Sequence, residues 1–429
     1  MYLTKEGYMP RLIDENITRY LNIFGAISIE GPKWCGKTWT ALNHANSVSY
    51  LTEKSQRDLA AIDPKYIFKN EWPQLIDEWQ IVPSIWDSVR HECDSDKKKG
   101  KFILTGSTSL SGEDDELASE VFHSGTGRIN TIRMHPMSLL ESNNSDGAAS
   151  ISQMKEGVLQ GKYIRKVELE ELAKYIVRGG WPENLTTNDS DIGVLPSSYI
   201  ESVVKKDMHE RKDRKRDANK MRMLIRSLAR NESTVVGDAT LVRDIEEYEN
   251  EAQLIESRHT ISDYISVLDD LYMTCNQPAY AINYRSSKRV GKSSKRHLAD
   301  PSIACAALNL NADKLLMDLE TFGLLFEALV ERDLRIYAEF LGGELYHFRD
   351  NESGDEVDAI IEFRDGEYAA FEIKLSDRRI DEAKESLIKF YKNVHKKPKF
   401  MCVIVGHQEA VVVDKETGII ITPITSLAP

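Results

Sequence analysis

The chain has 429 residues, of which 41% are hydrophobic and 29% charged, so it can bury hydrophobic cores, and wholesale disorder is excluded. A net charge of −13 excludes a uniformly basic nucleic-acid-binding surface, although it allows a local basic patch. No apolar run is long enough to span a membrane, the first residues lack the apolar core of a signal peptide, and the five scattered cysteines form no CxxC pair. We therefore expect a cytoplasmic protein of roughly two to four domains, without membrane contact, disulfide framework or zinc site.

The first third of the chain is predicted to form a parallel α/β sheet. A short helical lead over residues 1–20 comes first. Strands are expected at 26–29, 47–51 and 102–104, and helices between them at 38–44, 55–61 and 84–92. This alternation of apolar runs and amphipathic stretches is typical of a parallel sheet covered by helices.

Residues 31–38, GPKWCGKT, match the phosphate-loop (P-loop) pattern GxxxxGK[ST] at every fixed position, between a predicted strand and a predicted helix. Backbone N–H groups at a helix N-terminus bind phosphate, so we expect these residues to hold the phosphates of ATP. Lys37 would reach the β- and γ-phosphates, and the Thr38 hydroxyl would bind Mg²⁺. The alternative is an accidental Gly-Lys-Thr turn. The expected nucleotide-binding residues are Gly31, Pro32, Lys33, Trp34, Cys35, Gly36, Lys37 and Thr38.

An acidic pair, Asp77 and Glu78, follows a short apolar run about 40 residues after the P-loop. Asp77 would contact Mg²⁺ through its water shell, and Glu78 would polarise the attacking water. An acidic pair in a surface turn is the other interpretation.

The predicted strand at 102–104 ends in hydroxyl side chains, and two arginines follow. Ligands of open α/β sheets lie at the carboxyl ends of strands, so Thr105, Ser107 or Thr108 could sense the γ-phosphate. Arg128 or Arg133 could stabilise charge at the γ-phosphate in the transition state. A surface arginine is equally consistent with the sequence; Arg128 is included among the expected catalytic residues.

The middle of the chain is predicted to be helical and locally basic. A polar, turn-rich break at 142–147 precedes helical patterns over 165–230 and a small helical module over 220–285. Segment 205–230 holds 11 Lys and Arg against four Asp and Glu, and 285–297 forms a basic loop. Either these stretches contact DNA phosphates, or they are a solvated face of a module that packs on the ATPase.

A helix at 260–268 resembles the second helix of a winged helix-turn-helix. Thr260 is a plausible N-cap, and Ser262, Asp263 and Ser266 are expected on its exposed face. Its apolar stripe consists of Ile261, Tyr264, Ile265 and Leu268.

The C-terminal part is predicted to be a separate α/β domain. Helices are expected at 316–340 and 380–394. The expected strands are 344–350, 356–363, 367–375, 399–405, 410–413 and 418–423.

Two carboxylates and a lysine are expected to meet on one face of this C-terminal sheet. If the loop at 364–366 has three residues, Asp358 lies opposite Glu372, and Lys374 shares the face of Glu372. A two-residue turn would shift the register and scatter these groups. The carboxylates could hold Mg²⁺, and Lys374 could activate hydroxide for attack on a phosphodiester. This pattern is the signature of PD-(D/E)XK nucleases, whose sites a helix glutamate, here Glu327, often joins; cleavage and binding without cleavage both remain open.

Several segments together resemble bacterial and archaeal AAA-type ATPases that carry a C-terminal domain of unknown function similar to PD-(D/E)XK nucleases. The matching segments are GPKWCGKT, LIDEWQIVP, FILTGSTS, GRINTIRMHPMSLLE and RGGWPE. The resemblance implies ATP binding by Gly36, Lys37 and Thr38 and a metal-side role for Asp77 and Glu78. It departs from the family at Trp79, where a smaller apolar residue is usual, and in the longer polar stretch 142–160. It would make Arg178 a second nucleotide sensor, whereas the residues alone indicate a helix C-cap followed by a proline stop.

We therefore expect an AAA-like P-loop domain over 1–195, a helical or winged-helix-like module over 196–315 and a nuclease-like domain over 316–429. The expected function is an Mg²⁺-dependent ATPase that couples nucleotide state to a nuclease-like, DNA-binding C-terminal domain. The alternative is a nucleotide-switched DNA- or protein-binding regulator or defence component, with negligible hydrolysis and an inactive nuclease-like domain. ATP and ADP are the expected ligands, and a homo-oligomer is compatible with the sequence.

Overall fold

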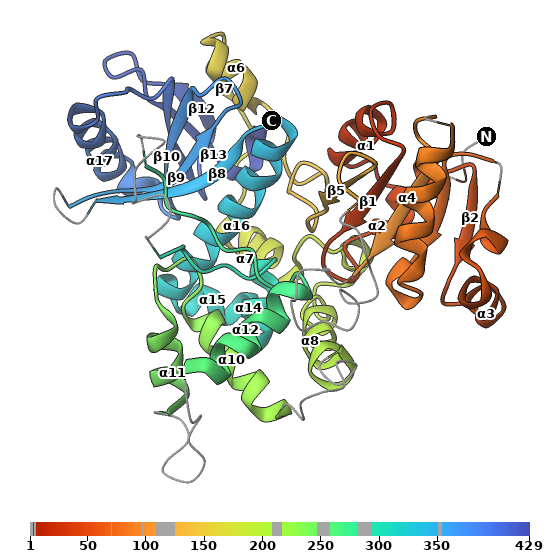
Figure 1. Cartoon of the computed structure of the whole chain (residues 1–429). Helices are drawn as coiled ribbons and strands as arrows, with labels where there is room; N and C mark the ends of the chain where they lie inside the picture. The colour runs from red at the N-terminus through yellow and green to blue at the C-terminus, as the bar shows by residue number, and fades with distance from the viewer. Residues whose placement is uncertain are drawn as a thin grey trace. The chain divides into compact units, whose positions relative to one another are not determined.

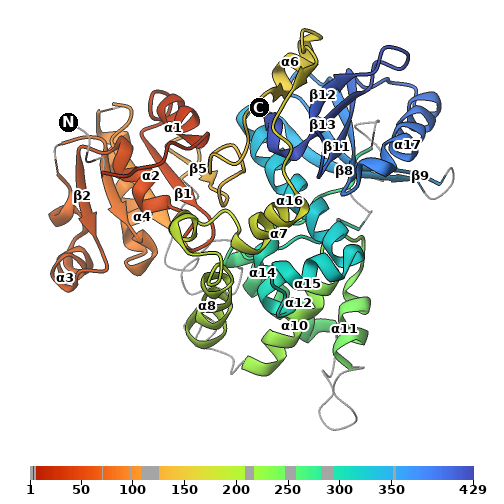
Figure 2. The same ribbon diagram turned by 180° about the vertical axis from the view of Figure 1, so that it is seen from behind.

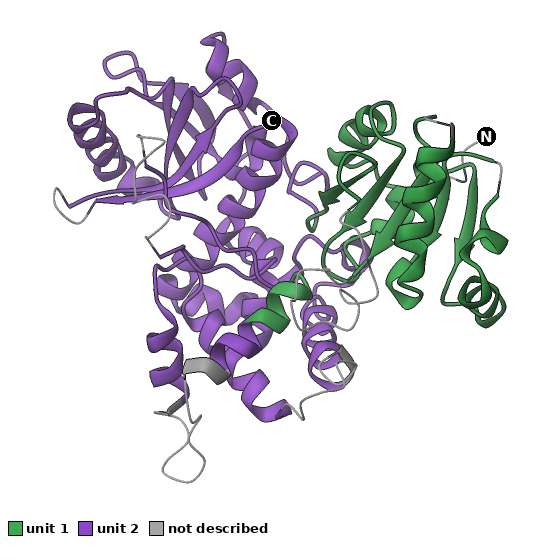
Figure 3. Cartoon of the chain, in the orientation of Figure 1, with its two compact units in different colours: residues 1–136, 266–273 green, residues 137–265, 274–429 purple. Residues whose placement is uncertain are grey.

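The computed structural model of the chain describes residues 3, 6–69, 71–96, 98–107, 125–207, 217–246, 258–281, 293–350 and 354–429. These residues form two compact units (Figure 3): unit 1 comprises 1–136 and 266–273, and unit 2 comprises 137–265 and 274–429. Thr108 and the basic stretches 208–216 and 285–292 lie outside the described residues. Among the described helices, none has both the length and the apolarity that a membrane crossing requires. The expected boundaries near 195 and 315 stay a prediction.

Unit 1 is built on a five-stranded sheet in which every neighbouring pair is parallel, in the order β2-β3-β4-β1-β5 (Figure 1). Its strands are β1 (Ala26–Glu30), β2 (Ser47–Tyr50), β3 (Gln74–Asp77), β4 (Phe102–Gly106) and β5 (Ile129–Arg133). Every residue of β1, β3 and β4 is buried, as in parallel sheets covered on both faces. The predicted parallel sheet is confirmed, and β5 is an additional strand that the sequence analysis did not assign.

Helices cover both faces of this sheet. They are α1 (Ile13–Leu21), α2 (Lys37–His44), α3 (Lys54–Ile62) and α4 (Ser84–Asp96), with 3₁₀ turns at Pro64–Ile67 and Trp79–Ile81. The chain moves in one direction along the sheet from β1 to β2 and in the other from β3 to β4. Because such crossovers are right-handed, α2 and α4 fall on opposite faces (Figures 1 and 2). On one side, Trp79 and Trp86 pack with ring centroids 4.8 Å apart in a cluster that includes Phe102.

Helix α12 (Arg258–Asp270) begins in unit 2 and ends in unit 1. Its predicted apolar stripe is buried, and of the expected exposed face Ser262 and Ser266 are exposed whereas Asp263 is partly buried. The side chain of Thr260, the expected N-cap, lies outside the described part of the helix.

Unit 2 contains a mixed seven-stranded sheet in the order β7-β12-β13-β11-β10-β9-β8. Strands β10, β11 and β13 are parallel to one another, and the remaining neighbours are antiparallel. The strands are β7 (Lys162–Tyr163), β8 (Glu344–Asp350), β9 (Asp355–Glu362), β10 (Tyr368–Lys374), β11 (Phe400–Val405), β12 (Ala410–Val413) and β13 (Ile420–Pro423). A separate two-stranded sheet pairs β6 (Ala149–Ser150) with β14 (Leu427–Ala428).

The helices of unit 2 form a helical middle part and two helices, α16 and α17, that pack against the mixed sheet (Figure 1). Instead of the single expected helix at 316–340 there are two, because the Asp318 side chain caps a new helix by accepting from the Thr321 N–H at 3.1 Å. The α-helices are α6 (Ile151–Glu156), α7 (Leu169–Arg178), α8 (Val194–Ser202), α10 (Ala218–Arg230), α11 (Asp238–Glu246), α14 (Pro301–Ala307), α15 (Ala312–Met317), α16 (Leu319–Phe340) and α17 (Ile380–Asn393). Residues Val203–Asp207 form a π-helical turn, and 3₁₀ turns lie at Pro182–Thr186, Asp377–Arg379 and Ile424–Ser426.

A buried charge network joins distant segments of unit 2. Arg332 of α16 lies 2.9 Å from Asp300 and 2.7 Å from Asp333. The Asp300 carboxylate also accepts the N–H of Ser302, in the first turn of α14, and the N–H of Gly180. Both aspartates and the arginine are nearly inaccessible to solvent, so each depends on the others for charge compensation.

Candidate functional sites

The P-loop joins the end of β1 to the start of α2 through a backbone that requires glycine. Gly31 and Gly36 have φ angles of 153° and 104°. A Cβ on Gly31 would lie 2.2 Å from the Met134 carbonyl oxygen. Trp34, with φ at 66°, also takes the left-handed conformation. The loop therefore has the sharp bend that directs backbone N–H groups toward an anion at the start of a helix.

Lys37 and Thr38 take positions suited to a nucleotide. The Lys37 ammonium donates to the carbonyls of Gly31 at 2.9 Å and Pro32 at 2.8 Å, so it lies within the loop itself. Thr38 Oγ1 donates to Asp77 Oδ1 at 2.8 Å, across from the end of β3. A hydroxyl and a carboxylate this close are oxygen donors of the kind that Mg²⁺ prefers, so these residues fit that ion.

The ends of β3 and β4 bring the other expected residues to the same place. Thr105 Oγ1 donates to the same Asp77 oxygen at 2.7 Å. The Ser107 hydroxyl lies 3.3 Å from Glu78 Oε2, and Gln80 also donates to this carboxylate. Gln80 was not predicted from the sequence. Together with Thr38, six side chains that can order water or a metal ion thus meet at the carboxyl edge of the sheet.

The expectation that Arg128 contacts the γ-phosphate is wrong. Its carbonyl accepts from Ala26, the first residue of β1, whereas the P-loop follows the last residue of that strand. The two ends of the strand are about 13 Å apart. The Arg128 guanidinium donates to Asp94 at 2.8 Å instead. Arg133, the other arginine considered, pairs in register with Glu30 at the P-loop end of the sheet.

Arg11, which was not predicted from the sequence, forms a hydrogen bond to the backbone of the P-loop. Its guanidinium donates to the carbonyls of Cys35 and His135, each at 2.8 Å, and only 6% of the residue is exposed. No sequence motif surrounds Arg11, so its role in holding the P-loop is visible only from its buried position in the structure.

Glu30, which immediately precedes the P-loop, is linked to the end of α12 within unit 1. The Tyr272 hydroxyl donates to the Glu30 carboxylate, and the Arg133 guanidinium lies 5.3 Å from the Tyr272 ring. Burial raises the pKa of Glu30, whereas Tyr272, Lys37 and Arg133 act to lower it. The pKa of the Glu30 carboxyl therefore depends on charges both at the P-loop and on β5.

The carboxylates of the C-terminal sheet meet in the predicted register. Phe363 donates to the Glu367 carbonyl just beyond the ends of β9 and β10, which leaves a three-residue loop at 364–366. Phe371 pairs with Ala359, so the next positions are Glu372 and Asp358. The Lys374 ammonium lies 2.7 Å from Glu372 Oε2 and 3.2 Å from Asp358 Oδ2. Burial, followed by the charge of Asp358, raises the pKa of Glu372 to about 7. Two carboxylates are oxygen ligands suited to one Mg²⁺ or Mn²⁺, although the described residues contain no cluster of three or more ligating side chains.

Glu327 is engaged by a lysine from the predicted basic loop. Glu327 Oε1 accepts from Lys295 Nζ at 2.6 Å, and only 4% of Lys295 is exposed. The next residue, Arg296, pairs with Asp238 at 2.5 Å. The expectation that the whole loop 285–297 presents its charges to DNA is therefore wrong for these two residues, because their charges are neutralised internally.

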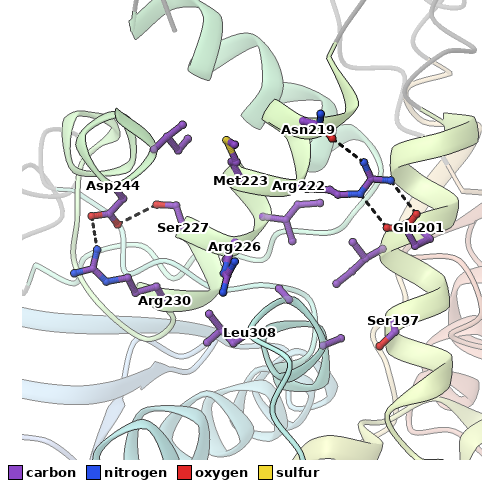
Figure 4. A pocket seen from close by; sticks show the side chains of 15 residues that line it. Ser197, Glu201, Asn219, Arg222, Met223, Arg226, Ser227, Arg230, Asp244 and Leu308 are labelled. Carbon is purple, nitrogen blue, oxygen red and sulfur yellow. Dashed lines mark hydrogen bonds and ion pairs between the residues drawn. The ribbon is translucent and has the colours of Figure 1, made fainter. Parts of the chain in front are cut away.

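The described part of the basic segment 205–230 is also largely paired. Arg222, Arg226 and Arg230 line a cavity of about 670 Å³ along α10 (Figure 4). Arg222 makes two bonds to Glu201, at 2.9 and 3.0 Å, and Arg230 lies 2.7 Å from Asp244. These pairs leave little excess positive charge for a DNA backbone in this part of the helix.

Arg178, the candidate second sensor, ends α7 in the manner that the residues alone indicated. Gly179 takes φ at 68°, and a Cβ there would lie 2.3 Å from Ser302 Oγ. The Arg178 guanidinium lies 2.6 Å from Asp189. The predicted C-cap is confirmed, and a sensor role for Arg178 stays a prediction.

Comparisons with known proteins give three matching family models and several weakly similar solved structures. Residues 24–143 match the AAA domain, residues 169–314 a domain of unknown function (DUF8612) and residues 322–427 a domain of unknown function (DUF4143). No curated protein sequence is significantly similar to the chain.

Three of the solved structures that match have low sequence identity and TM-scores below 0.5. The Walker-type ATPase PABY2304 of Pyrococcus abyssi is 13% identical, with 72% of this chain and 98% of that one covered and a TM-score of 0.40. The ORC2 protein of Aeropyrum pernix, solved as ADPNP–ADP complexes, is 14% identical, with 76% of this chain and 96% of that one covered and a TM-score of 0.31. AMPPCP-bound DnaA from Aquifex aeolicus is 15% identical, with 62% of this chain and 88% of that one covered and a TM-score of 0.30. Likenesses this weak support no statement about function. From the family matches and the fold, the chain combines an N-terminal AAA domain, a helical middle part and a C-terminal DUF4143 domain built on a mixed sheet.

Proposed function

We propose that the protein is an Mg²⁺-dependent ATPase of the AAA type that couples its nucleotide state to the rest of the chain. The observation that carries this proposal is the convergence of Thr38, Asp77 and Thr105 at the end of the P-loop, with Glu78 adjacent. A hydroxyl at the helix start and a carboxylate at the end of a nearby strand of the same sheet are what phosphoryl transfer to water requires at this position.

Each side chain has a role that follows from its position. On nucleotide binding, the Lys37 ammonium exchanges the Gly31 and Pro32 carbonyls for phosphate oxygens, because these carry more negative charge. Thr38 and Asp77 would hold Mg²⁺, which supplies charge neutralisation at the phosphates when bound. Glu78 orients and polarises the attacking water, assisted by the Ser107 hydroxyl that donates to it.

Coupling to the rest of the chain is supported by the link between Glu30 and Tyr272. Glu30 is covalently attached to the P-loop through Gly31, and Tyr272 directly follows α12. A change of charge in the P-loop alters the field at Glu30 and hence its bond to Tyr272. Since α12 continues into unit 2, the bond offers a route for nucleotide state to leave unit 1.

The test compares the Lys37→Ala variant with wild type and with a matched control, Lys54→Ala, whose lysine is exposed at the start of α3. Binding of a fluorescent ATP analogue and Mg²⁺-dependent phosphate release are measured for each. We expect Lys37→Ala to lose both while circular dichroism stays unchanged, and Lys54→Ala to retain both. ATP turnover by Lys37→Ala would refute the assignment. Nucleotide binding without phosphate release by wild type would favour a nucleotide-switched regulator.

A second candidate function, cleavage of a phosphodiester by the C-terminal domain, is favoured by the meeting of Asp358, Glu372 and Lys374. The arrangement is similar to that of PD-(D/E)XK nucleases: two carboxylates for a metal ion and an ammonium for a developing negative charge. Plasmid and single-stranded oligonucleotides are incubated with Mg²⁺ or Mn²⁺ and with wild type, Asp358→Ala, or the control Asp365→Ala in the exposed turn. Wild type and the control should cleave, and Asp358→Ala should not. Equal behaviour of all three proteins would reject this site.

A further inference from the structure

Lys295 lies at the edge of this carboxylate site, although neither the sequence motif nor the proposed cleavage function includes it. Its ammonium lies 2.6 Å from Glu327 Oε1 and 2.7 Å from Glu331 Oε1, both on α16. It also donates to the backbone carbonyl of Asp358 at 3.1 Å. Lys295 therefore touches the residue that carries one of the two site carboxylates.

The ammonium is fully satisfied and firmly held. An ammonium has three N–H donors, and Lys295 has three acceptors within hydrogen-bond distance. Its backbone exchanges two hydrogen bonds with Gln277, at 2.8 and 2.9 Å. The Gln277 side chain in turn donates to the Asp358 carbonyl at 3.3 Å. A lysine anchored in this way is a fixed part of the site.

A second buried cation completes this side of the cluster. The His297 ring nitrogens lie 2.9 Å from Glu232 and 3.1 Å from Glu331. Burial alone would lower the pKa of His297, but the charges of Glu331 and Glu232 raise it to about 9, so the ring is protonated at neutral pH. Burial likewise opposes ionisation of Glu331, yet Lys295 and His297 together bring its pKa down to about 2.

The position of Lys295 bears on how many metal ions the site can take. Its ammonium contacts both Glu327 and the backbone carbonyl of Asp358, so it lies where a second cation shared by these two residues would have to lie.

We propose that Lys295 supplies, as a fixed ammonium, the positive charge that a second metal ion would bring to the Glu327 side. The site then takes one divalent cation, on Asp358 and Glu372. Glu327 serves to hold Lys295 and does not ligate metal. This inference rests on the second candidate function, because it assigns the metal content of that same site.

The experiment counts Mn²⁺ ions bound per chain by electron paramagnetic resonance, using the full chain without nucleotide and with Asp77→Ala in every protein, so that the Thr38–Asp77 pair adds no ion to the count. Wild type is compared with Asp358→Asn and with the double variant Lys295→Met/Glu331→Gln. The double variant removes one positive and one negative charge, so it preserves the charge balance while it frees Glu327. We expect one ion for wild type, none for Asp358→Asn and two for the double variant. Lys295→Arg, which keeps the charge, should bind one ion.

The alternative outcomes separate the two proposals. Two ions on wild type, or one ion on both wild type and the folded double variant, would overturn the role of Lys295 and leave the cleavage site intact. No ion on wild type would overturn both. If thermal melting shows that the double variant does not fold, the wild-type and Lys295→Arg counts decide: one ion on each upholds the proposal, and two on either overturn it.

Discussion

Replacing Arg11 with methionine tests whether the P-loop is held in place before nucleotide arrives. The variant keeps most of the side-chain volume and loses the guanidinium that donates to the Cys35 and His135 carbonyls. A hydrogen bond from a charged donor contributes about 1.5–3 kcal/mol, so at the lower end the two bonds together contribute about 3 kcal/mol. If nucleotide binding must then supply this ordering, the Kd for ATP rises about 100-fold.

The assay is a titration of a fluorescent ATP analogue against wild type, Arg11→Met and the control Arg19→Met. Arg19 is exposed on α1, and its replacement should leave affinity unchanged. Melting temperatures separate a local effect on the loop from global unfolding. A folded Arg11→Met protein whose Kd stays within about twofold of wild type would refute the reasoning, because about twofold corresponds to less than 1 kcal/mol.

Three further substitutions test other parts of the structure. Glu78→Gln should retain ATP binding and lose turnover by about 100-fold, measured as phosphate release; unchanged turnover would remove Glu78 from the mechanism. The pKa of His297 is raised on folding to about 9, so its stabilising contribution is complete below about pH 6.5 and is lost as the pH rises through about 9. Urea unfolding should therefore show a loss of up to about 3 kcal/mol for wild type between pH 6.5 and pH 10 that is absent from His297→Gln, and parallel pH profiles would contradict this. Arg332→Met leaves two buried aspartates unpaired and should lower the free energy of unfolding by about 3–5 kcal/mol; a change below about 1 kcal/mol would show that the network is not needed.

Sequence patterns predicted those features of the fold that depend on local chemistry. Hydrophobic runs located β1, β2 and β4, three of the five strands of the parallel sheet, since strands buried on both faces are rich in apolar residues. The turn residues at 364–366 set the hairpin length, and this length alone places Asp358 opposite Glu372.

The positions of several charged side chains, in contrast, depend on long-range packing and could not be predicted from the sequence. Arg128 follows two glycines and gives no sign of which end of the sheet it occupies, because that depends on the unassigned strand β5. In the sequence, Lys295 is one of several basic residues in a charged loop. Only the fold shows that the buried glutamates Glu327 and Glu331 surround it. Arg11 contacts carbonyls 24 and 124 residues away, a relation that no local pattern encodes.

The buried ion pairs of unit 2 have a consequence for dissecting this protein by truncation. Asp300 and Lys295 fall within one family match, and their partners Arg332 and Glu331 fall within the next. A cut at residue 315 would separate these buried charges from their partners, so each fragment would contain unpaired charged side chains at positions that are buried in the intact chain. Recombinant expression of either half alone should therefore yield insoluble material.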